Sequence, residues 1–196
     1  MLLSGGPELP RVIDTSPVFG TRGREGIFFW PGGEYAGYWR RVEMKITDIL
    51  DEASIIQDLR STSKKGVLQE LSTVLVEGGK LPDRDKAVQV LLEREKLGST
   101  GIGDGIAIPH GKMKEIKELV TSFGRSIEGV DFESIDNKPT YLFFLLVAPE
   151  NSAGIHLKAL ARISRLLKDP SFRNRLMEAR DRGDLFRIIA EEDEKF

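Results

Sequence analysis

The sequence predicts an α/β domain in which helices cover both faces of a β-sheet. Two observations lead to this class. From residue 44 onward, segments with apolar residues at helical spacing alternate with short apolar runs that have the length of strands. One of these runs, residues 141–148, is apolar at every position, which is typical of a central strand buried on both of its faces.

Two amphipathic helices come first in the regular part of the chain. Thr62-Ser63 can cap a helix whose apolar stripe continues as far as the glycine pair at 78–79, where the helix should end. Asp83 can cap a second helix, with apolar positions between Ala87 and Leu92. We expect that helix to stop near Gly98.

The segments that follow predict further strands and helices. Residues 106–108 and 119–127 are predicted strands, in addition to the central one. A third helix is predicted over residues 154–168. Asp169-Pro170 then restarts a helix, because proline is tolerated at the first helical position. Asp184 is expected to cap a last short helix.

Residues 1–43 differ in composition from the rest of the chain. They contain both tryptophans and eight of the twenty glycines, and they show no sustained helical or strand period, although residues 27–35 could form a short strand and turn. We favour disorder or loose packing, as in a poorly ordered leader. An arm that packs on the domain or on a neighbour, and an extension upstream of a start at Met44, stay open. We therefore divide the chain into an N-terminal extension, residues 1–43, and one domain, residues 44–196.

Composition and charge exclude several classes of protein. The 29 basic and 31 acidic side chains among 196 residues give no support for nucleic acid as a partner. The absence of cysteine rules out disulfides, thiolate catalysis and cysteine metal sites. The first residues lack the pattern of a secretory signal, and the longest apolar run is too short for insertion into a membrane. The cytoplasm is therefore the expected compartment.

The most unusual stretch of the sequence is the glycine-rich run from Gly98 to Gly111, which ends in Ile-Ala-Ile-Pro-His-Gly. His110 is one of only two histidines, and Pro109 fixes the backbone just before it. A neutral imidazole can act as a nucleophile near pH 7, since its ordinary pKa is about 6.5. The glycine spacing matches neither G-x-G-x-x-G nor a P-loop, so no nucleotide site is expected. A plain turn is the alternative, but glycines also let an anion approach backbone N–H groups.

His156 and Arg94 are the other candidate site residues. His156 lies at the predicted start of the third helix, where free N–H groups and the helix dipole favour an anion such as phosphate; the alternative is a histidine at the end of a buried stripe. Arg94, near the end of the second helix, is either solvated or turned toward the glycine run as a phosphate clamp. Zinc is a weak alternative, because no H-x-x-H or H-E-x-x-H spacing occurs. We expect no metal and no cofactor.

Two motifs together resemble the IIA domain of the bacterial phosphoenolpyruvate-dependent sugar phosphotransferase system, of the fructose/mannitol type, which includes nitrogen-regulatory IIA proteins. The first motif is Arg94-Glu-Lys-Leu-Gly-Ser-Thr-Gly-Ile-Gly-Asp-Gly-Ile-Ala-Ile-Pro-His-Gly. The second is Phe143-Phe-Leu-Leu-Val-Ala-Pro-Glu-Asn-Ser, followed by His156-Leu-Lys-Ala-Leu-Ala. They occur in the right order, and the resemblance covers about residues 44–192. Residues 1–43 have no counterpart in the family pattern.

The resemblance implies a mixed β-sheet flanked by helices and a phosphotransferase component that works through a covalent phosphohistidine. It implies that His110 accepts a phosphoryl group from the phosphocarrier protein HPr and passes it to a IIB component for sugar uptake, while His156 and Arg94 support the site. The alternative is a nitrogen-related regulatory protein that uses the same phosphohistidine as a switch on protein partners. A binding module that has lost phosphorylation is a third alternative, which the joint presence of the three residues disfavours.

Overall fold

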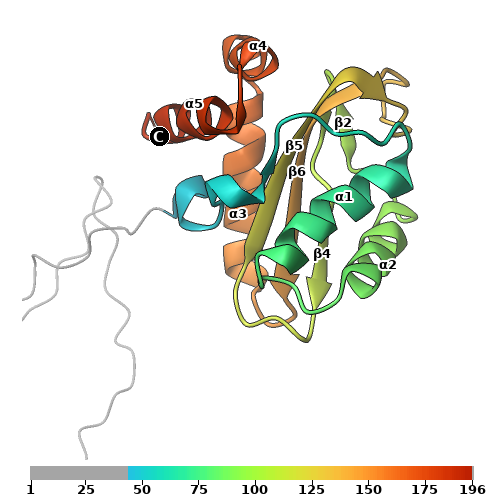
Figure 1. Cartoon of the computed structure of the whole chain (residues 1–196). Coiled ribbons are helices and arrows are strands. Elements are labelled where there is room, and N and C mark those ends of the chain that lie inside the picture. Colours follow the sequence, from blue (N-terminus) through green and yellow to red (C-terminus); the bar gives the residue numbers. More distant parts are fainter. Residues whose placement is uncertain (1–43, 196) are drawn as a thin grey trace, which may run out of the picture. The chain divides into compact units, whose positions relative to one another are not determined.

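The computed structural model describes residues 44–195, in which helices alternate with strands (Figure 1). Two single-turn 3-10 helices come first, η1 (Ile46–Asp48) and η2 (Glu52–Ser54). The α-helices of this part of the chain are α1 (Lys64–Glu77), α2 (Arg84–Glu95), α3 (Ala153–Leu167), α4 (Pro170–Glu178) and α5 (Arg182–Asp193). Its strands are β1 (Ile55–Ile56), β2 (Gly101–Gly103), β3 (Ile106–Ala107), β4 (His110–Met113), β5 (Val120–Val130) and β6 (Thr140–Pro149).

The strands form one mixed sheet in the order β1-β5-β6-β3-β2. The central strand β6 runs antiparallel to β5 and parallel to both β3 and β4. β3 pairs with the first half of β6, at Leu142–Phe143, and β4 pairs with the second half, at Leu146–Pro149. The predicted central strand is confirmed, because every residue from Leu142 to Ala148 is buried.

Helices cover both faces of the sheet, as the sequence predicts. α1 and α2 lie on one face, and α3, α4 and α5 lie on the other (Figure 1). Each face has its own apolar core, and β6 contributes to both because successive side chains of a strand alternate between faces. The even-numbered residues from Leu142 to Leu146 join the core under α3–α5. The odd-numbered residues from Phe143 to Val147 join the core under α1 and α2.

Side-chain caps explain where most of the helices begin. Ser63 caps α1 by accepting a hydrogen bond from a backbone N–H of the first turn, and Asp83 does the same for α2. Asp169 caps α4, whose first residue is Pro170. α1 ends at Gly78, at the predicted glycine pair. These predicted starts and ends are confirmed.

The predicted start of the last helix is wrong. α5 begins after Asp181, whose carboxylate accepts a hydrogen bond from the backbone N–H of Asp184 at 2.8 Å. Asp184 lies in the first turn, where its own carboxylate accepts from the N–H of Arg180 at 3.1 Å. Both aspartates can act as caps, and Asp181 is the one at which the backbone is still extended. The helix has 12 residues and is therefore not short.

The strands β1, β2 and β4 are additional to the predicted ones. They have two, three and four residues, too few to give a strand pattern, and they form because longer neighbours pair with them. β5 continues past the predicted residue 127 to Val130. The predicted strand and turn at 27–35, like the whole extension 1–43, lies outside the described residues. None of the described helices is long and apolar enough to cross a membrane.

Asp193, in the last turn of α5, holds this helix against the first described turn of the chain. Its carboxylate is 1% exposed and accepts a hydrogen bond from the backbone N–H of Ile46 at 2.6 Å. The same carboxylate forms an ion pair with the guanidinium of Arg162 in α3. A buried carboxylate is stable only when its oxygens are paired in this way. Asp193 therefore connects η1, α3 and α5 into one layer.

Candidate functional site

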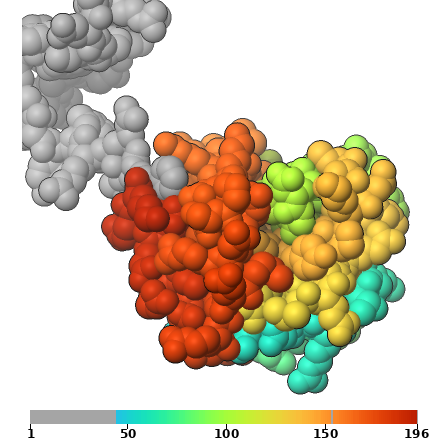
Figure 2. Space-filling view, turned by 90° about the horizontal axis from the view of Figure 1, so that it is seen from above, coloured from blue at the N-terminus to red at the C-terminus, as the bar shows by residue number. Residues whose placement is uncertain are grey.

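β4 and α3 bring the two histidines of the chain together. His110 is the first residue of β4 and lies opposite Leu146, near the end of β6. β6 then leads through a short turn into α3, and the first turn of α3 carries His156. The centres of the two rings are 5.5 Å apart, and their planes are inclined by 52°. Figure 2 shows the orange segment that includes α3 beside the yellow-green segment around residues 100–110.

The backbone next to His110 fixes the protonation of its ring. Nδ1 lies 2.8 Å from the carbonyl oxygen of Ile108. Because a carbonyl oxygen can only accept a hydrogen bond, Nδ1 carries the proton and Nε2 keeps a free lone pair. Pro109 lies between the two residues and has a restricted φ, so the ring is held by a stiff piece of backbone. The ring nitrogen of His110 that has an available lone pair is therefore Nε2.

The surroundings of both histidines favour the neutral form of the ring. Burial holds the pKa of His110 below its ordinary value, and the positive charge of Arg94 acts in the same direction. Burial also lowers the pKa of His156, with smaller contributions from His110 and from the ammonium of Lys112. Two neutral imidazoles side by side can offer one lone pair for attack and one N–H for hydrogen bonding.

His156 is the more deeply buried of the two rings, with 7% of its surface exposed. Its Nε2 atom is buried and has no hydrogen-bond partner among the described residues. Such an atom destabilises a folded protein, since it loses hydration without a replacement, and a functional role is one reason for which it is retained. The predicted buried stripe is also present, because Ile163 and Leu167 on the same helix are buried in the apolar core.

Arg94 lies near the C-terminal end of α2, next to the glycine loop. Arg94 does turn toward the loop, where its guanidinium donates a hydrogen bond to the carbonyl oxygen of Gly98 at 3.0 Å. The loop needs glycine at Gly103 and Gly105, where φ is +87° and +75°. The structure therefore brings His110 and His156 into direct contact and places Arg94 within electrostatic reach of His110.

The site contains two charged residues that the sequence did not single out. Lys112 is two residues beyond His110 in β4, so both side chains leave the strand on the same side. The alternation of side chains along a strand would predict the side to which Lys112 points. The sequence does not reveal this, because β4 is too short to be recognised as a strand. Glu95 is buried at the end of α2 and binds the loop through Thr100. In the sequence, Glu93-Arg94-Glu95 looks like an ordinary solvated helix end, so no signal marked this residue.

Comparison with known proteins identifies the family. The family model described as "Phosphoenolpyruvate-dependent sugar phosphotransferase system, EIIA 2" matches residues 48–192, a range that includes all three predicted site residues. The chain belongs to this family. The resemblance inferred from the sequence is thereby confirmed. The family includes sugar-specific and nitrogen-regulatory proteins, and its IIA members are phosphotransfer components.

Relatives of both kinds are similar to this IIA domain. The domain is 42% identical over 150 residues to the PTS system fructose-specific EIIABC component of Bacillus subtilis. That match covers 76% of this chain but only 24% of the relative, so the chain spans about a quarter of that longer protein. The domain is 43% identical over 148 residues to a nitrogen regulatory protein of Bradyrhizobium diazoefficiens, and this match covers 75% of the chain and 95% of the relative.

Solved structures agree with the fold of the IIA domain. The crystal structure of the nitrogen regulatory protein IIA-Ntr from Neisseria meningitidis matches with a TM-score of 0.69 and 35% identity, over 74% of this chain and 98% of that one. The mannitol enzyme IIA of Escherichia coli, solved in complex with phosphorylated enzyme IIB, matches with a TM-score of 0.61 and 25% identity. That alignment covers 72% of this chain and 97% of the mannitol protein.

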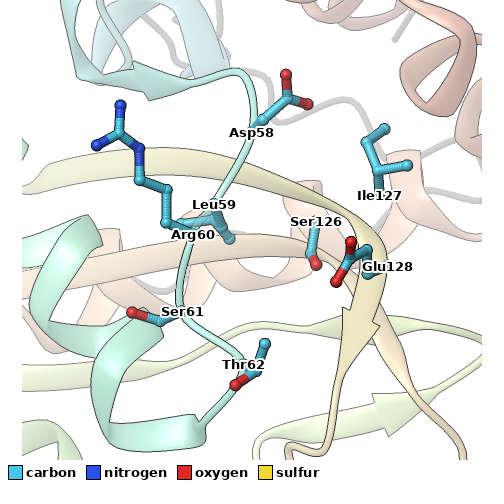
Figure 3. A pocket seen from close by; sticks show the side chains of 8 residues that line it. All are labelled: Asp58, Leu59, Arg60, Ser61, Thr62, Ser126, Ile127 and Glu128. Carbon is cyan, nitrogen blue, oxygen red and sulfur yellow. The ribbon is translucent and has the colours of Figure 1, made fainter.

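A hollow in the surface of the IIA domain is separate from the histidines. It has a volume of about 350 Å³ and is lined by residues 58–62, between β1 and α1, and by residues 126–128 of β5 (Figure 3). The side chain of Arg60 points away from Ser126 and Glu128 in this view. None of the three predicted site residues lines this hollow. Within residues 44–195, no group of three or more His, Asp or Glu side chains could hold a metal ion.

Proposed function

We propose that this IIA domain is a phosphocarrier that accepts a phosphoryl group from phospho-HPr on Nε2 of His110 and passes it to a IIB component for sugar uptake. The observation that carries this proposal is the state of the His110 ring. It is half-buried, its pKa is lowered, and its Nδ1 proton is held by the Ile108 carbonyl, so that Nε2 presents its lone pair. A fixed neutral imidazole is well suited to in-line attack on phosphorus.

The transfer step balances without an additional reactant. The bond between phosphorus and nitrogen in the donor phosphohistidine breaks, and its electron pair stays on the donor nitrogen. The lone pair on Nε2 of His110 forms the new bond to phosphorus. Nδ1 keeps its proton throughout, and the carbonyl of Ile108 stabilises the positive charge that the ring acquires. The same geometry then presents the phosphoryl group to a nucleophile on IIB.

Arg94 and His156 hold the transferred group in this proposal. A phosphoryl group carries a charge of about −1.5 to −2 near neutral pH. Arg94 uses one N–H on the Gly98 carbonyl and has further donors on its guanidinium. His156 adds Nε2, which has no partner among residues 44–195 and can donate to a phosphoryl oxygen in the tautomer that places the proton there.

Exposed apolar side chains flank the site and support docking of partner proteins. Leu97 follows Arg94 and is 84% exposed, while Ile155 and Leu157 lie on either side of His156 and are 55% and 64% exposed. Apolar groups gathered around a polar centre are typical of a protein-binding surface. We infer that HPr and IIB bind here in turn, with the cytoplasm as the compartment. The mannitol relative has been solved in complex with its phosphorylated IIB.

Phosphorylation in a reconstituted system tests the carrier role. The chain is incubated with enzyme I, HPr and labelled phosphoenolpyruvate, and the label is mapped. We expect one phosphate, on Nε2 of His110, and none on the His110→Ala variant. Label retained by a folded His110→Ala variant would overturn the proposal.

Variants of the supporting residues test the clamp. A charge-assisted hydrogen bond contributes about 1.5–3 kcal/mol, so His156→Ala and Arg94→Ala should each slow single-turnover transfer by roughly ten- to a hundredfold. Arg94→Lys keeps the charge without the planar fork and should fall between Arg94→Ala and wild type. Arg84→Ala is the matched control, because Arg84 lies at the opposite end of α2 in a surface ion pair with Asp85. Wild-type rates for both His156→Ala and Arg94→Ala would show that the clamp does not exist.

A nitrogen-related regulatory role is the second candidate. One observation favours it: the match to the Bradyrhizobium nitrogen regulatory protein, at 43% identity, is as strong as the match to the fructose-specific relative, at 42%. In this role, phosphorylation of His110 would switch binding to protein targets. Delivery of phosphate to one of a panel of IIB components supports the carrier role. Phosphorylation without delivery to any of them, together with a target bound in only one phosphorylation state, supports the regulatory role.

A further inference from the structure

The last residue of α2 is a buried acid, Glu95, which is 9% exposed. An anion at the C-terminal end of a helix is disfavoured by the helix dipole, and its burial removes hydration. Burial alone would raise the pKa of Glu95, but hydrogen bonds from Thr100, Lys64 and Ser99 lower it below the usual range. Glu95 is therefore ionised at a position that is unfavourable for an anion. This indicates that the hydrogen bonds to its carboxylate have a role beyond stabilising the helix end.

A path of hydrogen bonds leads from Glu95 to the nucleophile. Oε2 of Glu95 accepts from the backbone N–H of Thr100 at 2.9 Å and from its hydroxyl at 2.6 Å. The carbonyl of Thr100 accepts from the N–H of Ile108 at 3.0 Å. The carbonyl of Ile108 in turn accepts from Nδ1 of His110 at 2.8 Å. A shift of the Glu95 carboxylate would therefore be passed on to the His110 ring.

The other oxygen of Glu95 is anchored to elements outside this path. Oε1 accepts from the ammonium of Lys64 at 3.1 Å and from the hydroxyl of Ser99 at 2.9 Å. Lys64 is in the first turn of α1, its side chain is 16% exposed, and its ammonium lies 5.1 Å from the ring centre of Phe132. One carboxylate thus connects α1, α2 and the glycine loop. Without it, a loop this rich in glycine would have many accessible conformations.

We propose that Glu95 is a positioning residue for phosphoryl transfer, which fixes the tautomer and direction of the His110 ring through Thr100 and Ile108. The inference rests on the proposed function of His110. Glu95 touches neither the ring nor the phosphoryl group in this scheme. It acts on the ring through the carbonyl that keeps the proton on Nδ1, and its negative charge also raises the pKa of His110 directly.

The test compares Glu95→Gln with Glu93→Gln, a matched control on an exposed residue of the same helix that pairs with Lys96. Nitrogen-15 NMR at a pH above the histidine range reports the tautomer of His110, and single-turnover phosphorylation is measured over a range of phospho-HPr concentrations. For Glu95→Gln we expect a mixture of the two tautomers and a maximal rate lower by about tenfold or more. The half-saturating HPr concentration should stay within about twofold of wild type, because binding is not affected. Glu93→Gln should match wild type in all three measurements.

Thr100→Val is a second variant, which keeps the backbone N–H bond to Glu95 but loses the hydroxyl. It should show the same changes to a smaller degree, and it decides the question if Glu95→Gln does not fold. A folded Glu95→Gln protein with only the Nδ1–H tautomer and the rate of Glu93→Gln would overturn the inference. So would an unchanged Thr100→Val protein when Glu95→Gln is unfolded. If wild type accepts no phosphate on His110, the proposed function fails, while the tautomer measurement still tests the role of Glu95.

Discussion

At the scale of single residues, the two histidines are distinguished by what each ring nitrogen can reach. His110 has a backbone partner for Nδ1 and a free Nε2, whereas Nε2 of His156 is buried without a partner among the described residues. Burial lowers the pKa values of both rings. Each ring therefore becomes protonated at a lower pH than a free imidazole does. Nearby cations add to this effect, and Lys112 is the exposed cation that acts on His156.

The charge of Lys112 gives a prediction for the titration of His156. The ammonium of Lys112 lowers the pKa of His156, so Lys112→Gln should raise it and extend protonation of His156 to higher pH. NMR titration of the histidine ring signals measures this directly. Lys117→Gln is the control, since Lys117 is an exposed lysine that does not affect the pKa of either histidine. Equal His156 titration curves for the two variants would contradict the prediction.

At the scale of elements, the direction of His110 depends on how closely β4 lies against α2. A Cβ atom at Gly111 would come within 2.7 Å of Cγ1 of Val90, so only glycine allows this approach. Met113, two residues further along the strand, is buried in the core on the α1–α2 side. Because side chains alternate along a strand, His110 and Lys112 face the opposite side, where α3 presents His156.

Gly111→Ala should therefore affect both stability and transfer. The added methyl group forces β4 away from Val90, which should lower the free energy of unfolding by about 1–3 kcal/mol and slow phosphorylation of the adjacent His110. Val90→Ala should restore part of both losses in the double variant. Gly154→Ala is the stability control: a Cβ there meets nothing within 4 Å, so it should raise stability by less than about 1 kcal/mol. Denaturant unfolding and single-turnover rates are the measurements, and a Gly111→Ala protein as stable as wild type would contradict the close-packing argument.

The elements also show which parts of the fold could be predicted from the sequence. Helices α1, α2 and α4 have caps and apolar stripes that do not depend on the rest of the molecule, so their starts could be predicted. β2 and β4 could not, because Gly-Ile-Gly and His-Gly-Lys-Met become strands only when β3 and β6 pair with them. The contact between His110 and His156 depends on the pairing of β4 with β6. The sequence could therefore suggest that the two histidines act together, but it could not predict the distance between their rings. The burial of Glu95 depends on the loop folding over it.

At the scale of the whole domain, the site combines parts from both faces of the sheet. Arg94 and Glu95 come from α2 on one face, and His156 comes from α3 on the other, with β4 between them. The relative position of the two helix layers therefore determines whether the site is complete. The two cores that hold these layers consist of residues between 44 and 189.

The fragment 44–196 should therefore fold and transfer phosphate like the full chain. The family model begins at residue 48, and every contact described for the site is made by residues beyond 63. Single-turnover phosphorylation and thermal unfolding of the fragment and the full chain are compared under the same conditions. A fragment that folds normally but transfers phosphate more slowly, by a factor above about ten, would assign residues 1–43 a role in the reaction.

The bond between Asp193 and Ile46 also has a consequence for biosynthesis. The two residues are 147 positions apart, so the first turn of the domain meets its partner only after almost the entire domain has been made. At roughly 5–20 residues per second, translation of that interval takes about 7–30 s. During this time Ile46 and its apolar neighbours lack the helix that later covers them. The layer formed by η1, α3 and α5 therefore cannot close until residue 193 has been made and has left the ribosome, and until then the chain exposes this apolar surface to chaperones.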